Sequence, residues 1–276
     1  MHYRNTTVVI TGASSGIGLE FARFFAREGA RLVLTGRREA VLAQVRREAL
    51  DHGAASVDLV VGDLARAPVA SEVETIAAER DVLVLVNNAG FSHYSAVADA
   101  ETRPLLDMLA VQAQLPVRLC HAALQRMKRE GRGLIINVGS LAGRVAVPGS
   151  ALYVATKCFI ERLSETLALE AAPHGVVVQA LTPGYVRTDF HRDVENYRER
   201  RRNRGLIRWM DADAVVRCSM RAAERARRRL QSRPGRIPRR RDVVIIPGTA
   251  NRFLAAISPF VPRTLVYRAA AARPRM

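Results

Sequence analysis

The chain has 276 residues, of which 49% are apolar and 25% are charged. This composition is typical of a globular protein with a sizeable core and excludes a disordered chain. No window approaches the roughly 18 apolar residues of a membrane span, and no early apolar stretch has the length of a secretory signal. The three cysteines, Cys120, Cys158 and Cys218, have no metal-binding spacing. We therefore expect reduced thiols, a cytoplasmic location and no metal site.

The formal net charge of +17 is unevenly distributed along the chain. Residues 1–190 contain 20 basic and 19 acidic side chains, whereas residues 191–276 contain 23 arginines and 7 acids. The first part is thus nearly neutral and the last third is strongly basic. Of the 43 basic residues 41 are arginine, and the two lysines are Lys128 and Lys157.

Short runs rich in β-branched residues alternate with segments of helical periodicity from the start of the chain. The predicted strands are 6–11, 31–36, 56–63, 81–88, 133–140, 175–182 and 242–248. Strands that alternate with helices favour a parallel sheet covered on both faces. We predict an α/β fold with a doubly wound, Rossmann-type, seven-stranded parallel sheet. One domain would span residues 1–250, and a basic C-terminal extension, 251–276, would pack on the core or at an interface.

The segment "TGASSGIG", residues 11–18, follows the first predicted strand and opens the first helix. Gly12 permits a tight turn, while the absent side chains at Gly16 and Gly18 let backbone approach a pyrophosphate and let the helix approach the sheet. Main-chain N–H groups at the helix start then face the negative charge. We expect a dinucleotide to bind Gly12, Ser14, Ser15, Gly16, Ile17 and Gly18.

Two arginines, Arg37 and Arg38, stand near the end of the second predicted strand, where NAD-binding folds usually place an acidic residue. A carboxylate repels a 2′-phosphate, whereas a guanidinium binds it. Glu39 falls in the start of the next helix. The cofactor predicted is therefore NADP(H).

Tyr153 and Lys157 stand four residues apart in a predicted helix, "ALYVATKCF". Two residues at this spacing share a helix face, and that alone is one interpretation of the pair. The other is chemical, because lysine is a compact charge with a movable pKa and stands here in a chain that otherwise uses arginine.

After Pro183 and Gly184 the periodicity weakens over a long segment. An insertion at the C-terminal end of a parallel strand lies where doubly wound proteins bind ligands, so we predict a substrate lid at about 184–210. The alternative is an ordinary solvated connection.

The arginine-rich segment 225–241 is favoured as a solvated loop. Without interleaved aromatic residues or a nucleic-acid-binding module, nucleic acid is disfavoured as a partner. The apolar segment 251–268 has flanking arginines. It covers the core, joins subunits or rests peripherally on an anionic membrane surface.

Five motifs in one order, "TGASSGIG", "NNAG" (87–90), "NVGS" (137–140), "YVATK" (153–157) and "PGYVRT" (183–188), resemble the short-chain dehydrogenase/reductase family. The resemblance covers roughly residues 6–190 and is closest to NADP-type bacterial ketone reductases. It implies that Tyr153 is the general acid or base, that Lys157 lowers its pKa and binds the nicotinamide ribose, and that Ser140 polarises the carbonyl. Implied cofactor contacts are Asp63, Asn87, Ala89, Gly90, Tyr153, Lys157, Pro183, Gly184, Val186 and Thr188. Asn87 has a structural interpretation as well.

The family usually has an asparagine in the helix after "NNAG" that anchors a water of a proton relay, and this chain has Gln112 there. The function predicted is NADP(H)-dependent hydride transfer between nicotinamide and a carbonyl or secondary alcohol. The alternative is a nucleotide-binding regulatory protein with weak or no turnover. We expect a small-molecule substrate bound near His93, Tyr94, Val145, Val147 and the lid, and a homo-oligomer.

Overall fold

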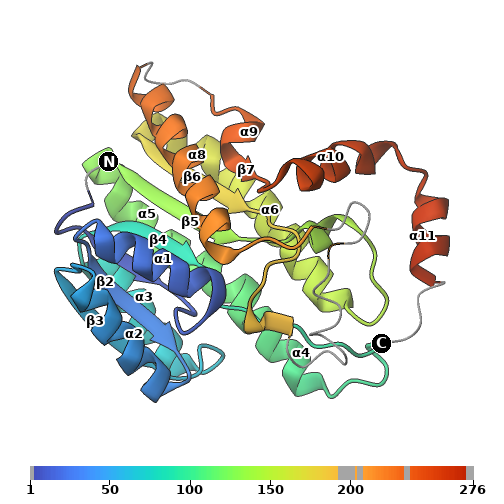
Figure 1. Cartoon of the computed structure of the whole chain (residues 1–276), viewed down its shortest axis with the longest axis horizontal. Helices are drawn as coiled ribbons and strands as arrows, with labels where there is room; N and C mark the ends of the chain where they lie inside the picture. Colours follow the sequence, from blue (N-terminus) through green and yellow to red (C-terminus); the bar gives the residue numbers. More distant parts are fainter. Residues whose placement is uncertain (1–2, 192–202, 204–207, 233–236, 272–276) are drawn as a thin grey trace.

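Seven parallel strands form the centre of this computed structural model, which describes residues 3–191, 203, 208–232 and 237–271 (Figure 1). The strands are β1 (Thr7–Ile10), β2 (Arg31–Gly36), β3 (Ser56–Val61), β4 (Val82–Asn87), β5 (Gly133–Val138), β6 (Val176–Leu181) and β7 (Val244–Ile245). Their order in the sheet is β3-β2-β1-β4-β5-β6-β7, and every pairing is parallel. The predicted doubly wound fold is confirmed.

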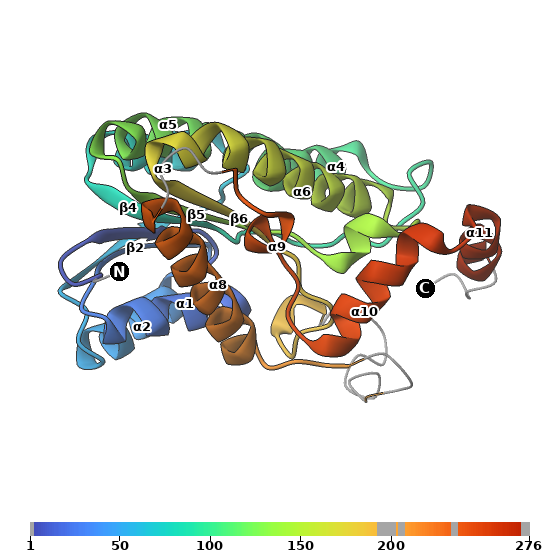
Figure 2. The same cartoon turned by 90° about the horizontal axis from the view of Figure 1, so that it is seen from above.

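Helices cover both faces of the sheet, as Figure 2 shows. One face packs against α1 (Gly16–Arg27), α2 (Glu39–Asp51) and α8 (Ala212–Ser232) through residues such as Phe21, Leu42 and Val215. The other packs against α3 (Ala67–Glu79), α5 (Leu115–Glu130) and α6 (Ala151–Ala171) through residues such as Val73, Leu119 and Ala168. With both faces covered, β4, β5 and β6 are buried along their whole length, which explains their continuous apolar sequence.

The strand order reverses between β1 and β4, which are neighbours although two strands separate them in the sequence. In such sheets the chain leaves the two strands in opposite directions, and ligands bind in the crevice at their carboxyl ends. The loops after β1, β4 and β5 therefore lie where a cofactor and substrate are expected.

A continuous helical segment runs from α4 (Thr102–Leu109) through the π-helical turn η1 (Ala110–Gln114) into α5. The wider π turn is rare and is frequently found at functional sites. It coincides here with Gln112.

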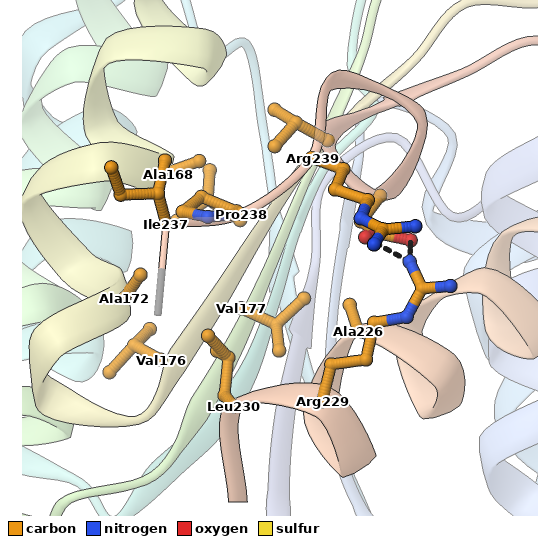
Figure 3. A pocket seen from close by; sticks show the side chains of 13 residues that line it. Ala168, Ala172, Val176, Val177, Ala226, Arg229, Leu230, Ile237, Pro238 and Arg239 are labelled. Carbon is orange, nitrogen blue, oxygen red and sulfur yellow. Dashed lines mark hydrogen bonds and ion pairs between the residues drawn. The ribbon is translucent and has the colours of Figure 1, made fainter. Parts of the chain in front are cut away.

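The last strand is shorter than the predicted 242–248, because Asp242 and Val243 belong to the short helix α9 (Arg240–Val243) and the chain leaves the sheet after Ile245. Arg229 of α8 donates from Nη1 to both carboxylate oxygens of Asp242, at 2.8 and 2.5 Å. This pair borders a small cavity of about 20 Å³ between α6, β6 and α8 (Figure 3). That volume holds about one water molecule, so the cavity is no substrate site. Part of the predicted arginine-rich loop is helix, since α8 extends to Ser232.

The C-terminal extension begins with α10 (Thr249–Ile257) and the turn η5 (Ser258–Phe260) and ends with α11 (Arg263–Ala271). Figures 1 and 2 both place α11 far from the sheet. Phe260 is 86% exposed and Leu265 is 54% exposed. A contact of this surface with a second copy or an anionic membrane stays a prediction. Within the described ranges, no helix combines the length and apolar character that a membrane span requires.

Candidate active site

A cavity of about 800 Å³ opens at the carboxyl ends of the strands. Most residues predicted from the sequence line it, although they come from loops far apart in the chain. These are Gly12, Ser14, Ser15, Gly16, Ile17, Arg37, Arg38, Asp63, Ala89, Gly90, Ser140, Tyr153, Lys157, Pro183, Gly184, Val186 and Thr188. Of the predicted residues in the described part of the chain, Gly18, Asn87, Gln112 and His93 lie outside its lining.

The glycine loop between β1 and α1 has the backbone shape that its sequence predicts. Gly12 and Gly16 have positive φ angles of 68° and 58°. A Cβ atom at Gly12 would lie 2.9 Å from Ala89 Cα, and one at Gly16 would lie 2.9 Å from Thr188 Cγ2. Helix α1 begins at Gly16, and Ser15 makes no side-chain cap bond, so the first N–H groups of the helix remain available to an anion. The residues present fit a dinucleotide pyrophosphate.

Asn88 holds this loop in place, a role that the sequence analysis missed. Its Nδ2 atom donates to the main-chain oxygens of Thr11, at 2.9 Å, and Gly12, at 3.0 Å. A Cβ atom at Gly18 would collide with Asn88 Nδ2 and with the Gly12 oxygen. Gly18 therefore serves the close packing of helix on sheet and loop rather than the cavity surface.

Asn87 lies inside the sheet, behind the cavity wall. Its Nδ2 atom donates to Asn137 Oδ1, at 2.8 Å, on the neighbouring strand. The Cys120 thiol lies 3.5 Å from the same Nδ2 atom, and burial raises the pKa of that thiol to about 12. This placement corresponds to the structural interpretation of Asn87.

Arg38 and Asp63 lie at the end of the cavity nearest β2 and β3. The Arg38 Nη2 atom donates to Ser14 Oγ at 3.2 Å and to the Ser14 main-chain oxygen at 3.3 Å, so the guanidinium lies beside the glycine loop. Arg37 is exposed next to it. Asp63 accepts a hydrogen bond from the Ala65 N–H at 3.0 Å. Two arginines thus line the cavity beside the glycine loop.

Ser140, Tyr153 and Lys157 meet at the centre of the cavity. Tyr153 and Lys157 lie one turn apart on α6, and Lys157 Nζ is 5.6 Å from the centre of the Tyr153 ring. Ser140 follows β5 and caps the short helix η2 (Leu141–Arg144) by accepting from the Ala142 N–H at 3.1 Å. A hydrogen bond also links Ser140 and Tyr153. A phenol, an ammonium and a hydroxyl therefore converge on one point.

Burial sets the protonation of this group. It raises the pKa of the Tyr153 phenol well above its ordinary value, and the hydrogen bond with Ser140 acts in the opposite direction. Burial also lowers the pKa of Lys157 to about 8. Both shifts have the same cause, because a buried site disfavours the charged form of either group. At neutral pH the site holds a protonated phenol ready to donate.

The part of the cavity near Tyr153 is lined mainly by apolar residues, with a few charged ones. The predicted residues Tyr94, Val145 and Val147 line it. The predicted lid contributes Asp189, Phe190 and Arg208. Its residues 192–202 and 204–207 lie outside the described residues. The Phe190 ring lies 5.8 Å from that of Tyr153. The C-terminal extension supplies a further wall that the sequence analysis missed: Leu254, Ile257, Val261 and Val266. The only signal in the sequence was the apolar character of segment 251–268.

The family described as short chain dehydrogenase matches residues 6–199. The chain belongs to this family. A galactitol 2-dehydrogenase (L-tagatose-forming) from Cereibacter sphaeroides is 34% identical over 215 residues, which cover 76% of this chain and 80% of that protein. The family and this relative support an oxidoreductase role for the chain.

Two solved structures resemble the whole chain, including the C-terminal extension. A short-chain dehydrogenase from Sphingobium yanoikuyae in complex with NADPH has a TM-score of 0.77 and 29% identity and covers 98% of each chain. A bulky-bulky ketone specific alcohol dehydrogenase from Comamonas testosteroni has a TM-score of 0.74 and 28% identity and covers 98% of this chain and 96% of its own.

Gln112 departs from the usual short-chain dehydrogenase pattern, and the structure shows what its side chain contacts. The amide Nε2 donates to the main-chain oxygen of Phe91 at 2.8 Å. Within the described residues, Oε1 is buried and accepts no hydrogen bond, and a Cβ atom at Gly90 would lie 2.8 Å from it. The amide therefore supports the loop after β4. Its predicted part in a proton relay stays a prediction.

Proposed function

We propose that the protein catalyses NADP(H)-dependent hydride transfer between nicotinamide and the carbon of a ketone or secondary alcohol. The observation that carries this proposal is the convergence of Ser140, Tyr153 and Lys157 in the cavity that begins at the glycine loop. A nucleotide held at that loop extends along the cavity toward these three side chains. The bound nicotinamide supplies or accepts the hydride.

In this proposal the chain's own residues orient the substrate and move one proton. Ser140 donates a hydrogen bond to the carbonyl oxygen, which polarises the bond and holds it beside Tyr153. As the carbonyl carbon gains the hydride, the oxygen takes the phenolic proton, and the product is an alcohol. In the reverse direction the Tyr153 phenolate removes the hydroxyl proton as the carbon loses its hydride.

Lys157 compensates for the burial that raises the pKa of Tyr153. An ammonium favours the phenolate that forms when the proton leaves, because opposite charges attract strongly in a buried site. One of its three N–H donors is used by the Val138 oxygen, which leaves two for the phenol and a ribose hydroxyl. Arginine, with a fixed planar fork, does not match this arrangement.

Two observations support NADP(H) over NAD(H). Arg37 and Arg38 line the cavity beside the glycine loop, and a guanidinium fork suits a 2′-phosphate. The similar Sphingobium yanoikuyae dehydrogenase was solved with NADPH.

The cavity supports a bulky, largely apolar substrate. Its volume of about 800 Å³ lies within the roughly 300–1,000 Å³ range of ligand sites. Apolar side chains dominate the part of the lining near Tyr153: Leu254, Ile257, Val261, Val145 and Val147. The charged groups beside them are Arg144, Asp189 and Arg208. The likeness to an alcohol dehydrogenase specific for bulky-bulky ketones supports the same class.

The alternative is a regulatory protein that binds the nucleotide with weak or no turnover, and the replacement of the usual asparagine by Gln112 favours it. Loss of NADPH absorbance with a panel of dialkyl, alkyl-aryl and diaryl ketones separates the two. Turnover of any ketone, lost in Tyr153→Phe, supports the enzyme. Saturable NADPH binding without turnover across the panel supports the regulator.

A further inference from the structure

The segment that carries Ser140 is attached to the catalytic helix α6 at both of its ends. Before Ser140, the Val138 main-chain oxygen accepts a hydrogen bond from Lys157 Nζ at 3.0 Å. After it, the Arg144 guanidinium forms a two-pronged pair with Glu161, Nε to Oε2 at 3.1 Å and Nη2 to Oε1 at 2.6 Å. Ser140 lies between these two attachments.

The second attachment is tight and nearly closed to solvent. The side chains of Arg144 and Glu161 are 16% and 7% exposed. Between Ser140 and Arg144, the turn lies so close to the helix that a Cβ atom at Gly143 would be 2.7 Å from the Cys158 nitrogen and 2.8 Å from the Lys157 carbonyl carbon. The turn that follows Ser140 is packed closely on α6. We therefore expect it to shift along α6 only when the Arg144–Glu161 ion pair opens.

Glu161 stands on the same face of α6 as the residues that carry the chemistry. Tyr153, Lys157 and Glu161 follow one another at intervals of four residues, and all three are buried. A carboxylate that is removed from water requires partners. Arg144 supplies two hydrogen bonds from the segment that carries Ser140, and Arg240 of α9 supplies a third, from Nη2 to Glu161 Oε1 at 3.2 Å. The pair thus joins the two pieces of chain that supply the hydroxyl and the phenol.

We propose that Arg144 and Glu161 form a clamp that positions Ser140 against Tyr153, so that both are positioning residues for hydride transfer. This inference rests on the proposed function, and it explains what holds Ser140 in place relative to Tyr153. A misplacement of about 1 Å at a reacting group can cost roughly a hundredfold in rate, so a clamp outside the reacting atoms has a measurable effect on kcat.

A rival use of Arg144 is recognition of an anionic group on the substrate, because Arg144 also lines the cavity. Its Nε and Nη2 donors are directed at Glu161, which argues against this use. The two uses predict different kinetics. Loss of an anion-binding arginine raises KM for anionic substrates and leaves kcat unchanged, whereas loss of a clamp lowers kcat for neutral substrates as well.

The test compares four variants of the full chain with the wild type. Glu161→Gln leaves the Arg144 charge without its partner, whereas Arg240 keeps Glu165, to which its Nε donates at 2.9 Å. Glu161→Asp keeps the charge with a shorter reach. The double variant Arg144→Met with Glu161→Met removes both charges together, and replacing a buried pair with apolar residues of similar volume is often neutral for stability. Arg162→Gln is the matched control, since Arg162 reaches the same carboxylate at 3.7 Å from a side chain that is 67% exposed.

With a neutral ketone and saturating NADPH, Glu161→Gln and the double variant are expected to lose roughly ten- to a hundredfold in kcat. Glu161→Asp retains more activity than Glu161→Gln, Arg162→Gln matches the wild type, and NADPH affinity is the same in all. The rate of alcohol oxidation falls at acid pH, where the Tyr153 phenolate is protonated. We expect this fall to occur at higher pH in the two impaired variants, because the pKa of Tyr153 rises when Ser140 no longer stabilises the phenolate. A double variant with the thermal stability, kcat and pH profile of the wild type overturns the clamp.

A second measurement keeps this test separate from the proposed function. Amide hydrogen exchange of residues 139–145 is expected to accelerate in Glu161→Gln and in the double variant but not in Arg162→Gln. A wild type without turnover defeats the proposed function, while the exchange still decides whether the clamp holds this segment. Unchanged exchange in the double variant overturns the clamp.

Discussion

Lys157 on α6 donates a hydrogen bond from Nζ to the main-chain oxygen of Val138, 3.0 Å away at the end of β5. The bond fixes the ammonium beside the Tyr153 ring, and it ties the catalytic helix to the strand after which Ser140 stands. The position of the Lys157 ammonium thus depends on the main-chain oxygen of Val138, which a substitution at residue 138 does not remove. The predictions below follow from this arrangement and from the cavity around it.

Replacement of Tyr153 by Phe should remove turnover and spare the nucleotide site. The ring packs as before, and only the transferable proton is lost. We expect kcat to fall by about 10²- to 10⁴-fold, while the Kd for NADPH, measured by fluorescence titration, is unchanged. A phenylalanine variant with the wild-type rate on the best ketone would show that another group donates the proton.

Replacement of Lys157 by Met should stabilise the free protein in a pH-dependent way. The unfolded chain holds the lysine proton up to its ordinary pKa of 10.5, whereas burial lowers the folded value to about 8. Between these values unfolding takes up a proton, so the stability of the wild type rises with pH. We expect the advantage of the methionine variant, about 3 kcal/mol at pH 7, to shrink from pH 8 to 10.5 in urea unfolding. An advantage that is constant over this range would contradict the lowered pKa.

Replacement of Arg37 and Arg38 together by alanine should weaken NADPH binding selectively. Hydrogen bonds to a charged group contribute about 1.5–3 kcal/mol, so we expect a roughly ten- to a hundredfold higher Kd for NADPH and little change for NADH. Arg46→Ala, an exposed position on α2, serves as the control. Equal affinity of the wild type for both nucleotides would refute the assigned role of the two arginines.

Substitutions of Gln112 distinguish a role of its amide in a proton relay from a purely structural role. If its amide serves proton delivery, Gln112→Asn preserves or raises kcat and Gln112→Leu lowers it, with NADPH binding unchanged in both. If the amide only supports the Phe91 oxygen, Gln112→Leu lowers thermal stability but leaves kcat per folded molecule unchanged. Steady-state rates at saturating NADPH, normalised to folded protein, distinguish the two.

Leu254 should limit the size of the substrate from the side of the C-terminal extension. We expect Leu254→Trp to lower kcat/KM for a diaryl ketone by at least about tenfold and to leave a small dialkyl ketone nearly unaffected, because a filled pocket rejects bulk by about 1–3 kcal/mol. Ala256→Trp, exposed on the same helix, controls for the added indole. Equal losses for both ketones would show that α10 does not discriminate by size.

The parts of this site that could be predicted are formed by residues that lie close together in the sequence. Gly12 and Gly16 bracket one turn, and Tyr153 and Lys157 lie one helical turn apart, so their joint placement follows from local geometry. The seven strands were predictable for a similar reason, since most of them are continuous or nearly continuous buried runs, with β3 as the exception. Most predicted strands extended a residue or two beyond the observed ends, and β7 was overestimated most, because Asp242 and Val243 belong to α9 and the strand contains only Val244 and Ile245.

The contacts that escaped prediction join residues distant in the sequence. Asn88 reaches Gly12 from 76 residues away, and Leu254 reaches the cavity from beyond the last strand. The Asn87 side chain turns inward to Asn137 because the two are partners on adjacent strands, a register that no single strand reveals. The π turn at Gln112 likewise leaves no periodic signature over five residues.

The scarcity of lysine has a practical consequence for chemical labelling. The chain carries two side-chain amines, that of Lys128, which is exposed in the last turn of α5, and that of Lys157, whose pKa burial lowers to about 8. A reagent that modifies neutral amines and is small enough to enter the cavity should react faster with Lys157 than with Lys128. If Lys157 binds the nicotinamide nucleotide as proposed, a bound nucleotide protects Lys157 and not Lys128. The mass gained with and without nucleotide then counts the occupied sites in a sample.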